Sequence, residues 1–248
     1  MTDKKSMAGG HEAVSGEPTT ERVRGIFGRI AESYDAFNLL SSMGFDRGWR
    51  RAAVRATQLT PGSVVLDICS GTGDLALALA ARGVARRVEA TDFSPEMLAV
   101  ASRKAPKIAS QTEVSFSVAD AQALPFADAS FDVVTVAFGV RNLPDRAANF
   151  REVLRVLRPG GRYVILEFST PGWAPWRAVY HLYLGYVIPL LGSLLTRGDR
   201  ASFEYLNASI RSFPDQSSLA RELELAGFAS AEWKNLTGGI VAIHSAVK

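Results

Sequence analysis

Short hydrophobic runs alternate with amphipathic stretches between residues 63 and 168, and this rhythm predicts βαβ units. The apolar runs indicate strands at residues 63–68, 87–91, 114–118, 133–137 and 161–168. The amphipathic stretches predict helices at residues 74–81, 95–104 and 146–157, the last of them stopped by Pro-Gly-Gly at 159–161. Near-continuous apolar runs such as VVTVAF are typical of a parallel sheet that helices cover on both faces.

The two ends of the chain depart from this rhythm. Residues 228–236 and 240–247 are β-like and joined by Thr-Gly-Gly, which predicts a hairpin at an antiparallel edge of the sheet. Helical spacing from Glu21 and over residues 47–59 predicts a helical N-terminal cap at 20–60, whereas residues 1–19 are expected to be a disordered tail. The predicted fold is α/β, a Rossmann-like, mostly parallel sheet in a single domain at 20–248.

One segment near the C-terminal third is unusually apolar. Residues 178–196 carry no charged side chain, glycine and proline interrupt them, and they are too short for a stable membrane span. We expect residues 171–212 to form an inserted lid over an apolar substrate. A buried cap helix and a lid that touches a membrane surface, helped by Arg177, Arg197 and Arg200, are both compatible with this pattern and can coexist.

Composition narrows the class of protein. The 248 residues are 47% hydrophobic, which excludes a disordered or fibrous chain. The net charge of +3 comes from scattered basic residues, so nucleic-acid binding is not predicted. Cys69 is the single cysteine and the three histidines lie far apart, so neither a disulfide nor a metal site is expected. No signal-peptide pattern opens the chain, and we expect a cytoplasmic protein.

The most informative motif is a glycine loop between a predicted strand and a predicted helix. Gly71-Thr72-Gly73 follows the first strand, where an open α/β sheet binds nucleotide-type ligands. With Ala76 the loop also fits G-x-G-x-x-A, so a dinucleotide and an NAD(P) oxidoreductase stay open as the alternative. Asp67 and Asp74 bracket the loop with negative charge, which disfavours a pyrophosphate and favours the cationic sulfonium of S-adenosylmethionine.

Two further acidic positions follow later strands. Asp92 ends the second strand, where a carboxylate can bind both ribose hydroxyls, although it is also placed to cap the next helix. Asp120 and Ala121 end the third strand, where an adenine amino group can meet a carboxylate, although Asp120 is also a turn-forming residue. The predicted cofactor-binding residues are therefore Asp67, Gly71, Thr72, Gly73, Asp92, Asp120 and Ala121.

These motifs resemble those of the ubiquinone/menaquinone-biosynthesis C-methyltransferases. The resemblance rests on GTGD, DAxxLPFxDxSFD, AFGVRN, RVLRPGGRYVILEFS and GGIVAIHSAVK, and it extends from IFGRIAESYDAFNLL to the last residue. It implies C-methylation of demethylmenaquinol, or of the related ubiquinone-pathway quinol, with S-adenosylhomocysteine as by-product. The family's cofactor contacts fall on Thr72, Asp92, Asp120 and Ala121. Ala137 stands where ubiquinone-type bacterial enzymes often have Ser, which favours demethylmenaquinol, a prenylated naphthoquinol.

The transfer itself needs positioning and a stabilised quinol anion. Arg141 and Asn142 follow the fourth strand and are predicted to be catalytic with Tyr34; the alternatives are an Arg141–Asp145 ion pair, a turn asparagine and a packed aromatic. Glu167 lies near the end of the fifth strand, and we expect it either to face the pocket or to anchor the following loop. Three further expectations concern His181 as a core residue, Cys69 as a packing residue, and Asp35 as a substrate contact or helix cap.

The sequence leaves the oligomeric state open, a homodimer included. It also leaves open a non-catalytic protein that binds the methyl donor and stabilises an assembly.

Overall fold

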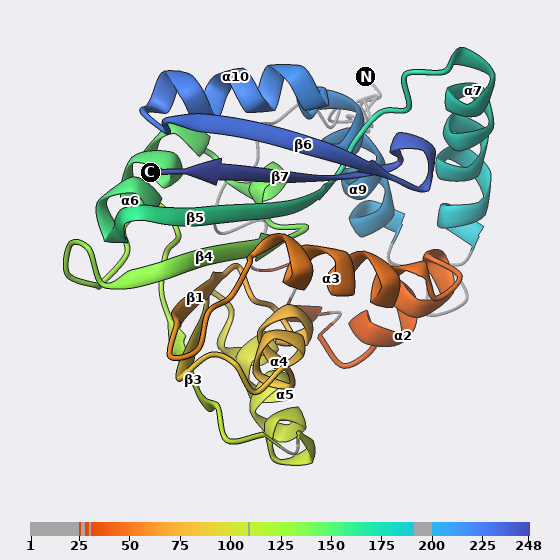
Figure 1. The fold of residues 1–248 in the computed structure, drawn as a ribbon. Helices are drawn as coiled ribbons and strands as arrows, with labels where there is room; N and C mark the ends of the chain where they lie inside the picture. Colours follow the sequence, from red (N-terminus) through yellow and green to blue (C-terminus); the bar gives the residue numbers. More distant parts are fainter. Residues whose placement is uncertain (1–24, 26–27, 30, 109, 191–199) are drawn as a thin grey trace, which may run out of the picture.

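The computed structural model describes residues 25, 28–29, 31–108, 110–190 and 200–248, with side chains from residue 205 onward in the last segment. Its centre is a seven-stranded sheet in the order β3-β2-β1-β4-β5-β7-β6 (Figure 1). The strands are β1 (Val64–Ile68), β2 (Arg87–Asp92), β3 (Glu113–Val118), β4 (Phe131–Ala137), β5 (Leu157–Phe168), β6 (Ser230–Leu236) and β7 (Val241–Val247). Strands β1 to β5 are parallel, whereas β7 pairs antiparallel with both β5 and β6. The predicted parallel sheet with an antiparallel C-terminal hairpin is confirmed.

Helices cover both faces of this sheet. Helices α6 (Arg146–Val156) and α10 (Gln216–Ala226) pack on one face, and α3 (Phe45–Ala56) and α4 (Asp74–Ala80) pack on the other. Helix α5 (Pro95–Lys104) lies against β2 and β3. All five residues of β1 are buried; Val64, Leu66 and Ile68 belong to one apolar core and Val65 to the other. This two-sided burial explains why the strand is apolar at every position but Asp67.

The start of β5 differs from the prediction. Helix α6 ends at Val156, and the strand is already extended at Leu157, before the Pro-Gly-Gly segment. Leu157 pairs with Phe131, but the next paired residue is Arg162, opposite Val133. The segment therefore forms an irregularity at the start of the strand, because the residue before a proline is disfavoured in helical conformation and Gly160 has a φ of +77°.

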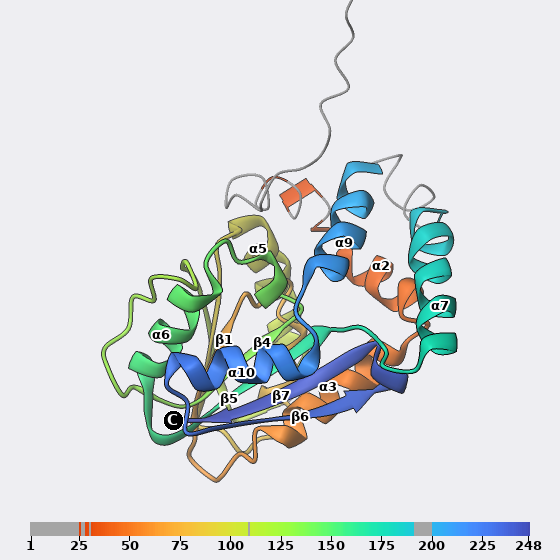
Figure 2. The ribbon, with the colours of Figure 1, turned by 90° about the horizontal axis from the view of Figure 1, so that it is seen from above.

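Further helices gather beyond the carboxyl ends of the parallel strands. They are α2 (Tyr34–Ser41), α7 (Ala174–Leu182), the π-helical turn η3 (Tyr183–Val187) and α9 (Arg200–Ser212). Figure 2 shows α2, α7 and α9 side by side, and their apolar side chains form a small separate core with Phe37, Tyr180 and Ile210. No described helix is long and apolar enough to cross a bilayer.

The expected cap and lid fall partly outside the described residues. The tail 1–19, residues 20–24 of the cap and Arg197 of the lid lie outside them, and the side chain of Arg200 is not described. Of the described cap helices, α3 packs directly on the sheet and α2 extends past the strand ends.

Candidate functional site

The sheet order creates a crevice at the carboxyl ends of β1 and β4. The chain leaves β1 for β2 on one side and later returns to β4 on the other, which is the switch point where open α/β sheets bind ligands. Two adjoining cavities of about 60 and 20 Å³ lie here and share Cys69, Phe93, Asn142 and Leu143 as lining residues. The larger is also lined by Gly71 and Asp92, and the smaller by Asp120 and Ala121.

Two glycines shape the loop at this crevice for different reasons. Gly71 has a φ of +56°, and a Cβ placed on it would enter open space beside the cavity. Gly73 has a φ of +79°, and a Cβ there would come within 2.9 Å of the Ala101 Cβ on α5. Gly71 therefore leaves room for a ligand, whereas Gly73 permits close packing of the loop against α5.

Asp92 connects the glycine loop to the end of β2. Its carboxylate accepts hydrogen bonds from the backbone N–H of Gly71 at 2.8 Å and of Ser94 at 2.9 Å. Burial raises the pKa of Asp92 above its ordinary value. The N-cap of α5 is Ser94, whose hydroxyl accepts from the Met97 N–H, so capping is not the role of Asp92.

Asp67 and Asp74, which bracket the loop, present less negative charge to a ligand than the sequence suggests. Asp67 is 1% exposed and accepts a hydrogen bond from the Thr135 hydroxyl at 2.6 Å, and burial raises its pKa to about 7. Asp74 is ion-paired with Arg50 at 3.2 Å and with Lys104. The negative charge predicted at Asp67 and Asp74 is therefore reduced, at Asp67 by its raised pKa and at Asp74 by its two ion pairs. The acidic residues that line the two cavities are Asp92 and Asp120.

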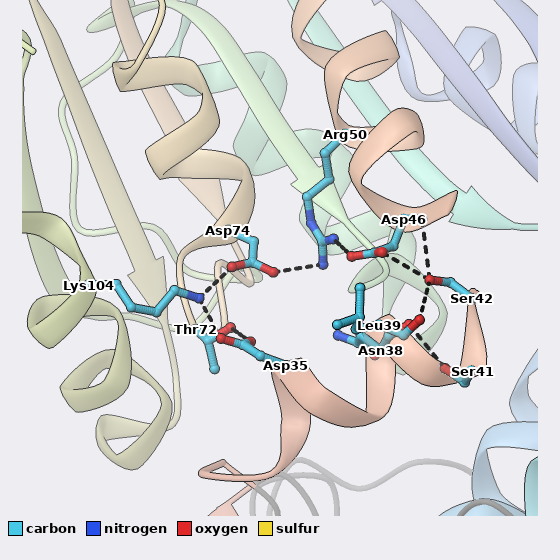
Figure 3. Close-up of polar contacts among 10 residues, drawn as sticks. All are labelled: Asp35, Asn38, Leu39, Ser41, Ser42, Asp46, Arg50, Thr72, Asp74 and Lys104. Atoms are coloured by element: carbon cyan, nitrogen blue, oxygen red, sulfur yellow. Dashed lines mark hydrogen bonds and ion pairs between the residues drawn. The ribbon is translucent and has the colours of Figure 1, made fainter. Parts of the chain in front are cut away.

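A chain of polar contacts joins the glycine loop to α2 and α3 (Figure 3). The Thr72 hydroxyl donates to Asp35 at 2.5 Å, and Lys104 bridges Asp35, at 2.7 Å, and Asp74. Arg50 continues the chain to Asp46 on its own helix. In this structure Asp67, Thr72 and Gly73 do not line either of the two cavities.

A second and larger cavity of about 400 Å³ lies beneath α2, α7, η3 and α9. Most of its lining is apolar and aromatic, including Trp49, Phe168 and Ile210. Tyr34 and Phe138 line this cavity and the crevice alike. An acid-lined crevice and an apolar chamber thus meet at two aromatic side chains.

Arg141 and Asn142 lie at this junction, but with partners that the sequence did not indicate. The Arg141 guanidinium pairs with Glu167 at 2.9 Å, and its carbon lies 5.3 Å from the centre of the Phe168 ring. Asp145 instead caps α6, so the expected alternative of an Arg141–Asp145 pair is wrong. Burial opposes the charge of Arg141, but Glu167 and nearby tyrosines raise its pKa above the ordinary value.

The turn before Arg141 is strained and tightly packed. Phe138 has a φ of +59°, in the left-handed region that disfavours a bulky side chain. A Cβ on Gly139 would lie 2.5 Å from the Cys69 Cβ, so this position accepts only glycine without movement. Asn142 donates to the Phe138 carbonyl at 3.2 Å and accepts from the Tyr205 hydroxyl at 3.1 Å. Hydrogen bonds from Arg141 and Asn142 to the Phe138 carbonyl hold both residues at the junction and help to maintain the strained turn.

Tyr34, Cys69 and His181 differ in their burial and in the pKa shifts that burial causes. Burial raises the pKa of Tyr34, which keeps its hydroxyl neutral beside the junction. Burial also raises the pKa of Cys69 well above its ordinary value, as expected for a packing thiol and not for a nucleophile. His181 is half-buried on α7 outside the lining of all three cavities, and burial lowers its pKa.

Comparison of the sequence with known proteins identifies the family to which the chain belongs. The profile of the ubiE/COQ5 methyltransferase family matches residues 16–248. The chain belongs to this family. It is 45% identical to a demethylmenaquinone methyltransferase of Beutenbergia cavernae, over 91% of this chain and 90% of that protein. It is 40% identical to a ubiquinone/menaquinone biosynthesis C-methyltransferase of Shewanella halifaxensis, over 96% and 95% of the two chains.

Solved structures of low sequence identity share the fold. The [4+2]-cyclase SpnF matches with a TM-score of 0.67 at 19% identity, over 93% of this chain and 96% of that chain. A phosphoethanolamine N-methyltransferase of Haemonchus contortus, solved with S-adenosylmethionine, matches with a TM-score of 0.58 at 18% identity, over 80% and 52% of the two chains. The predicted fold class and the expected membership of an S-adenosylmethionine-dependent methyltransferase family are confirmed.

Proposed function

We propose that this protein transfers a methyl group from S-adenosylmethionine to the ring carbon of demethylmenaquinol, releasing menaquinol and S-adenosylhomocysteine. The observation that carries this proposal is the junction of an acid-lined crevice with a large apolar chamber at Tyr34 and Phe138. A polar cationic donor suits the first space and a prenylated ring suits the second. The names of the relatives and Ala137 at the crevice favour the menaquinone substrate over the ubiquinone-pathway quinol.

The crevice residues fit the donor chemically. The open space at Gly71, the carboxylate of Asp92 and the Asp120–Ala121 strand end would hold the ribose and adenine, and the bound donor supplies a methyl group on a sulfonium. The two cavities together are smaller than the roughly 300–1,000 Å³ of ordinary ligand pockets, so binding requires a wall to move. We assign Tyr34 as that wall, because it lines both the crevice and the chamber. It lies on α2, whose Asp35 accepts hydrogen bonds from Thr72 of the loop and from Lys104 of α5.

Arg141 is assigned to stabilise the quinol anion. Loss of a hydroxyl proton sends electron density to the ring carbon, and a fixed cation beside the oxygen favours that anion. The raised pKa of Arg141 keeps its guanidinium charged, so it does not itself remove the proton. Asn142, held between Phe138 and Tyr205, is assigned to orient the ring, and Tyr34 to cover the reacting atoms.

Quinone analysis in a bacterial strain that lacks its own C-methyltransferase tests the substrate. Expression of this chain is expected to restore methylated menaquinone, seen by mass spectrometry. Restoration of ubiquinone alone would move the assignment to the other quinol.

Titration calorimetry addresses the oxidoreductase alternative, since binding of NAD without binding of S-adenosylhomocysteine would overturn the proposal. Full restoration by an Arg141→Ala, Asn142→Ala variant would instead indicate a non-catalytic role.

We also propose that the protein contacts the membrane surface around the mouth of the chamber. Leu40, Met43, Val179 and Leu182 are each between 48% and 72% exposed, and Met43 and Val179 also line the chamber. No acidic residue occurs at positions 36–45 or 168–198 of the sequence, whereas the exposed Arg47 adds positive charge. This combination suits an anionic lipid surface from which a prenylated ring can enter the chamber.

Vesicle sedimentation tests this surface. A Leu40→Ser, Leu182→Ser variant is expected to bind vesicles that contain anionic lipid at least about fivefold more weakly than the unchanged protein, because apolar area inserts into the interface. Leu225→Ser is the matched control, since Leu225 is 77% exposed but lies on α10. Equal vesicle binding by the double variant and the control would remove the proposed surface.

A further inference from the structure

Tyr180 carries a buried hydroxyl inside the chamber. The residue lies on α7, is 3% exposed and lines the chamber, and its hydroxyl hydrogen-bonds to no described residue. A buried hydroxyl without a partner is costly, because it has lost water and received nothing in exchange. Such a group is a candidate for a hydrogen bond that forms only when a ligand is present.

Two neighbouring tyrosines of the chamber differ from Tyr180, because their hydroxyls bond to the protein. The Tyr183 hydroxyl donates to the Ser41 carbonyl at 2.5 Å, and the Tyr205 hydroxyl donates to Asn142 at 3.1 Å. Both residues line the same space. The hydroxyls of Tyr183 on η3 and Tyr205 on α9 thus bond to the protein, whereas the Tyr180 hydroxyl bonds to no described residue.

The surroundings of Tyr180 place its hydroxyl at the reacting end of the chamber. Phe168 packs against the same apolar cluster as Tyr180, and the Arg141 guanidinium carbon lies 5.3 Å from the centre of the Phe168 ring. Tyr180 therefore lies on the side of the chamber that holds the Arg141–Glu167 ion pair. Burial raises the pKa of Tyr180, which keeps the hydroxyl protonated and able to donate. The buried residues that cluster with Tyr180, including Phe37 and Leu184, are apolar, so they offer a ligand no hydrogen bond.

We propose that the Tyr180 hydroxyl donates a hydrogen bond to a ring oxygen of the acceptor and so selects an oxygenated ring at this end of the chamber. This inference rests on the proposed function, because it takes the quinol as the ligand. A quinol has two ring oxygens on opposite sides, and Arg141 and Tyr180 supply separate donors that can address them. Tyr180 is thus a specificity-determining residue for the acceptor and has no part in donor binding.

A Tyr180→Phe variant tests the inference, because it removes only the hydroxyl. The KM for a water-soluble demethylmenaquinol analogue is expected to rise about 3- to 10-fold, the size of one neutral hydrogen bond, with a smaller change in kcat. The dissociation constant for S-adenosylhomocysteine should stay unchanged. The ligand-free variant should melt at the same temperature as the unchanged protein or above it, because phenylalanine removes an unsatisfied group. A merely structural hydroxyl would lower the melting temperature.

The matched control is Tyr186→Phe. Tyr186 is 74% exposed on the adjoining η3 and does not line the chamber. The KM of this variant for the quinol analogue should therefore equal that of the unchanged protein. Equal KM values for the Tyr180→Phe and Tyr186→Phe variants would overturn the inference. Absence of methyl transfer by the unchanged protein would instead overturn the proposed function, so the two failures are distinguishable.

Discussion

Replacing Arg141 with methionine is expected to lower methyl transfer about 10²- to 10³-fold, the usual effect of removing one group that stabilises a developing anion. The same change should reduce the free energy of unfolding by about 3–5 kcal/mol, because it leaves the buried Glu167 carboxylate without its partner. Kinetics with the quinol analogue and denaturant unfolding measure the two effects separately.

A double variant separates the catalytic loss from the loss of stability. Arg141→Met with Glu167→Gln replaces both charges, so most of the stability should return while transfer stays at the level of the single variant. Recovery of transfer together with stability would show that Arg141 acts only by holding the fold. S-adenosylhomocysteine should bind both variants, since Arg141 lines the chamber and not the donor crevice.

Asp92→Ala is expected to weaken donor binding by about 1–3 kcal/mol, which raises the dissociation constant for S-adenosylhomocysteine between about 5- and 150-fold. The carboxylate is lost as a ligand group, and the Gly71 N–H loses its acceptor at the same time. Calorimetry measures the change. Because burial already raises the pKa of Asp92, donor binding by the unchanged protein should also weaken at acidic pH, as the carboxylate becomes protonated.

Asp132→Ala is the matched control for Asp92. The Asp132 carboxylate also accepts a backbone N–H, that of Val64 at 2.8 Å, but at the end of β1 away from the glycine loop. This variant should lose some stability and keep its affinity for S-adenosylhomocysteine. An unchanged dissociation constant in Asp92→Ala, or an equal rise in both variants, would show that Asp92 does not contact the donor.

Sequence patterns predicted the centre of the sheet well because the central strands β1 and β4 are mostly buried. The run at residues 63–68 and the helix start after Gly73 depend on local apolar periodicity and turn chemistry, and the structure has them within a residue. The Pro-Gly-Gly segment was placed less well, because its conformation depends on pairing with β4 and on the Gly160 N–H, which donates to the Lys248 carbonyl.

The partners of the charged residues were not predictable in the same way. Asp74 is neutralised by Arg50 and Lys104, which come from helices on either side of it in the sequence. Arg141 pairs with Glu167, 26 residues away, and not with the nearby Asp145. Spacing along the chain indicated which residues gather at the strand ends, but only tertiary packing decides which charges remain available to a ligand.

The most direct test follows a labelled methyl group. Purified protein is incubated with S-adenosylmethionine labelled in its methyl group and a reduced demethylmenaquinone analogue, and the products are identified by mass spectrometry. We expect one label on the quinol ring carbon and an equal amount of S-adenosylhomocysteine. Label on an oxygen or on another phenolic acceptor, with none on the quinol ring, would contradict it.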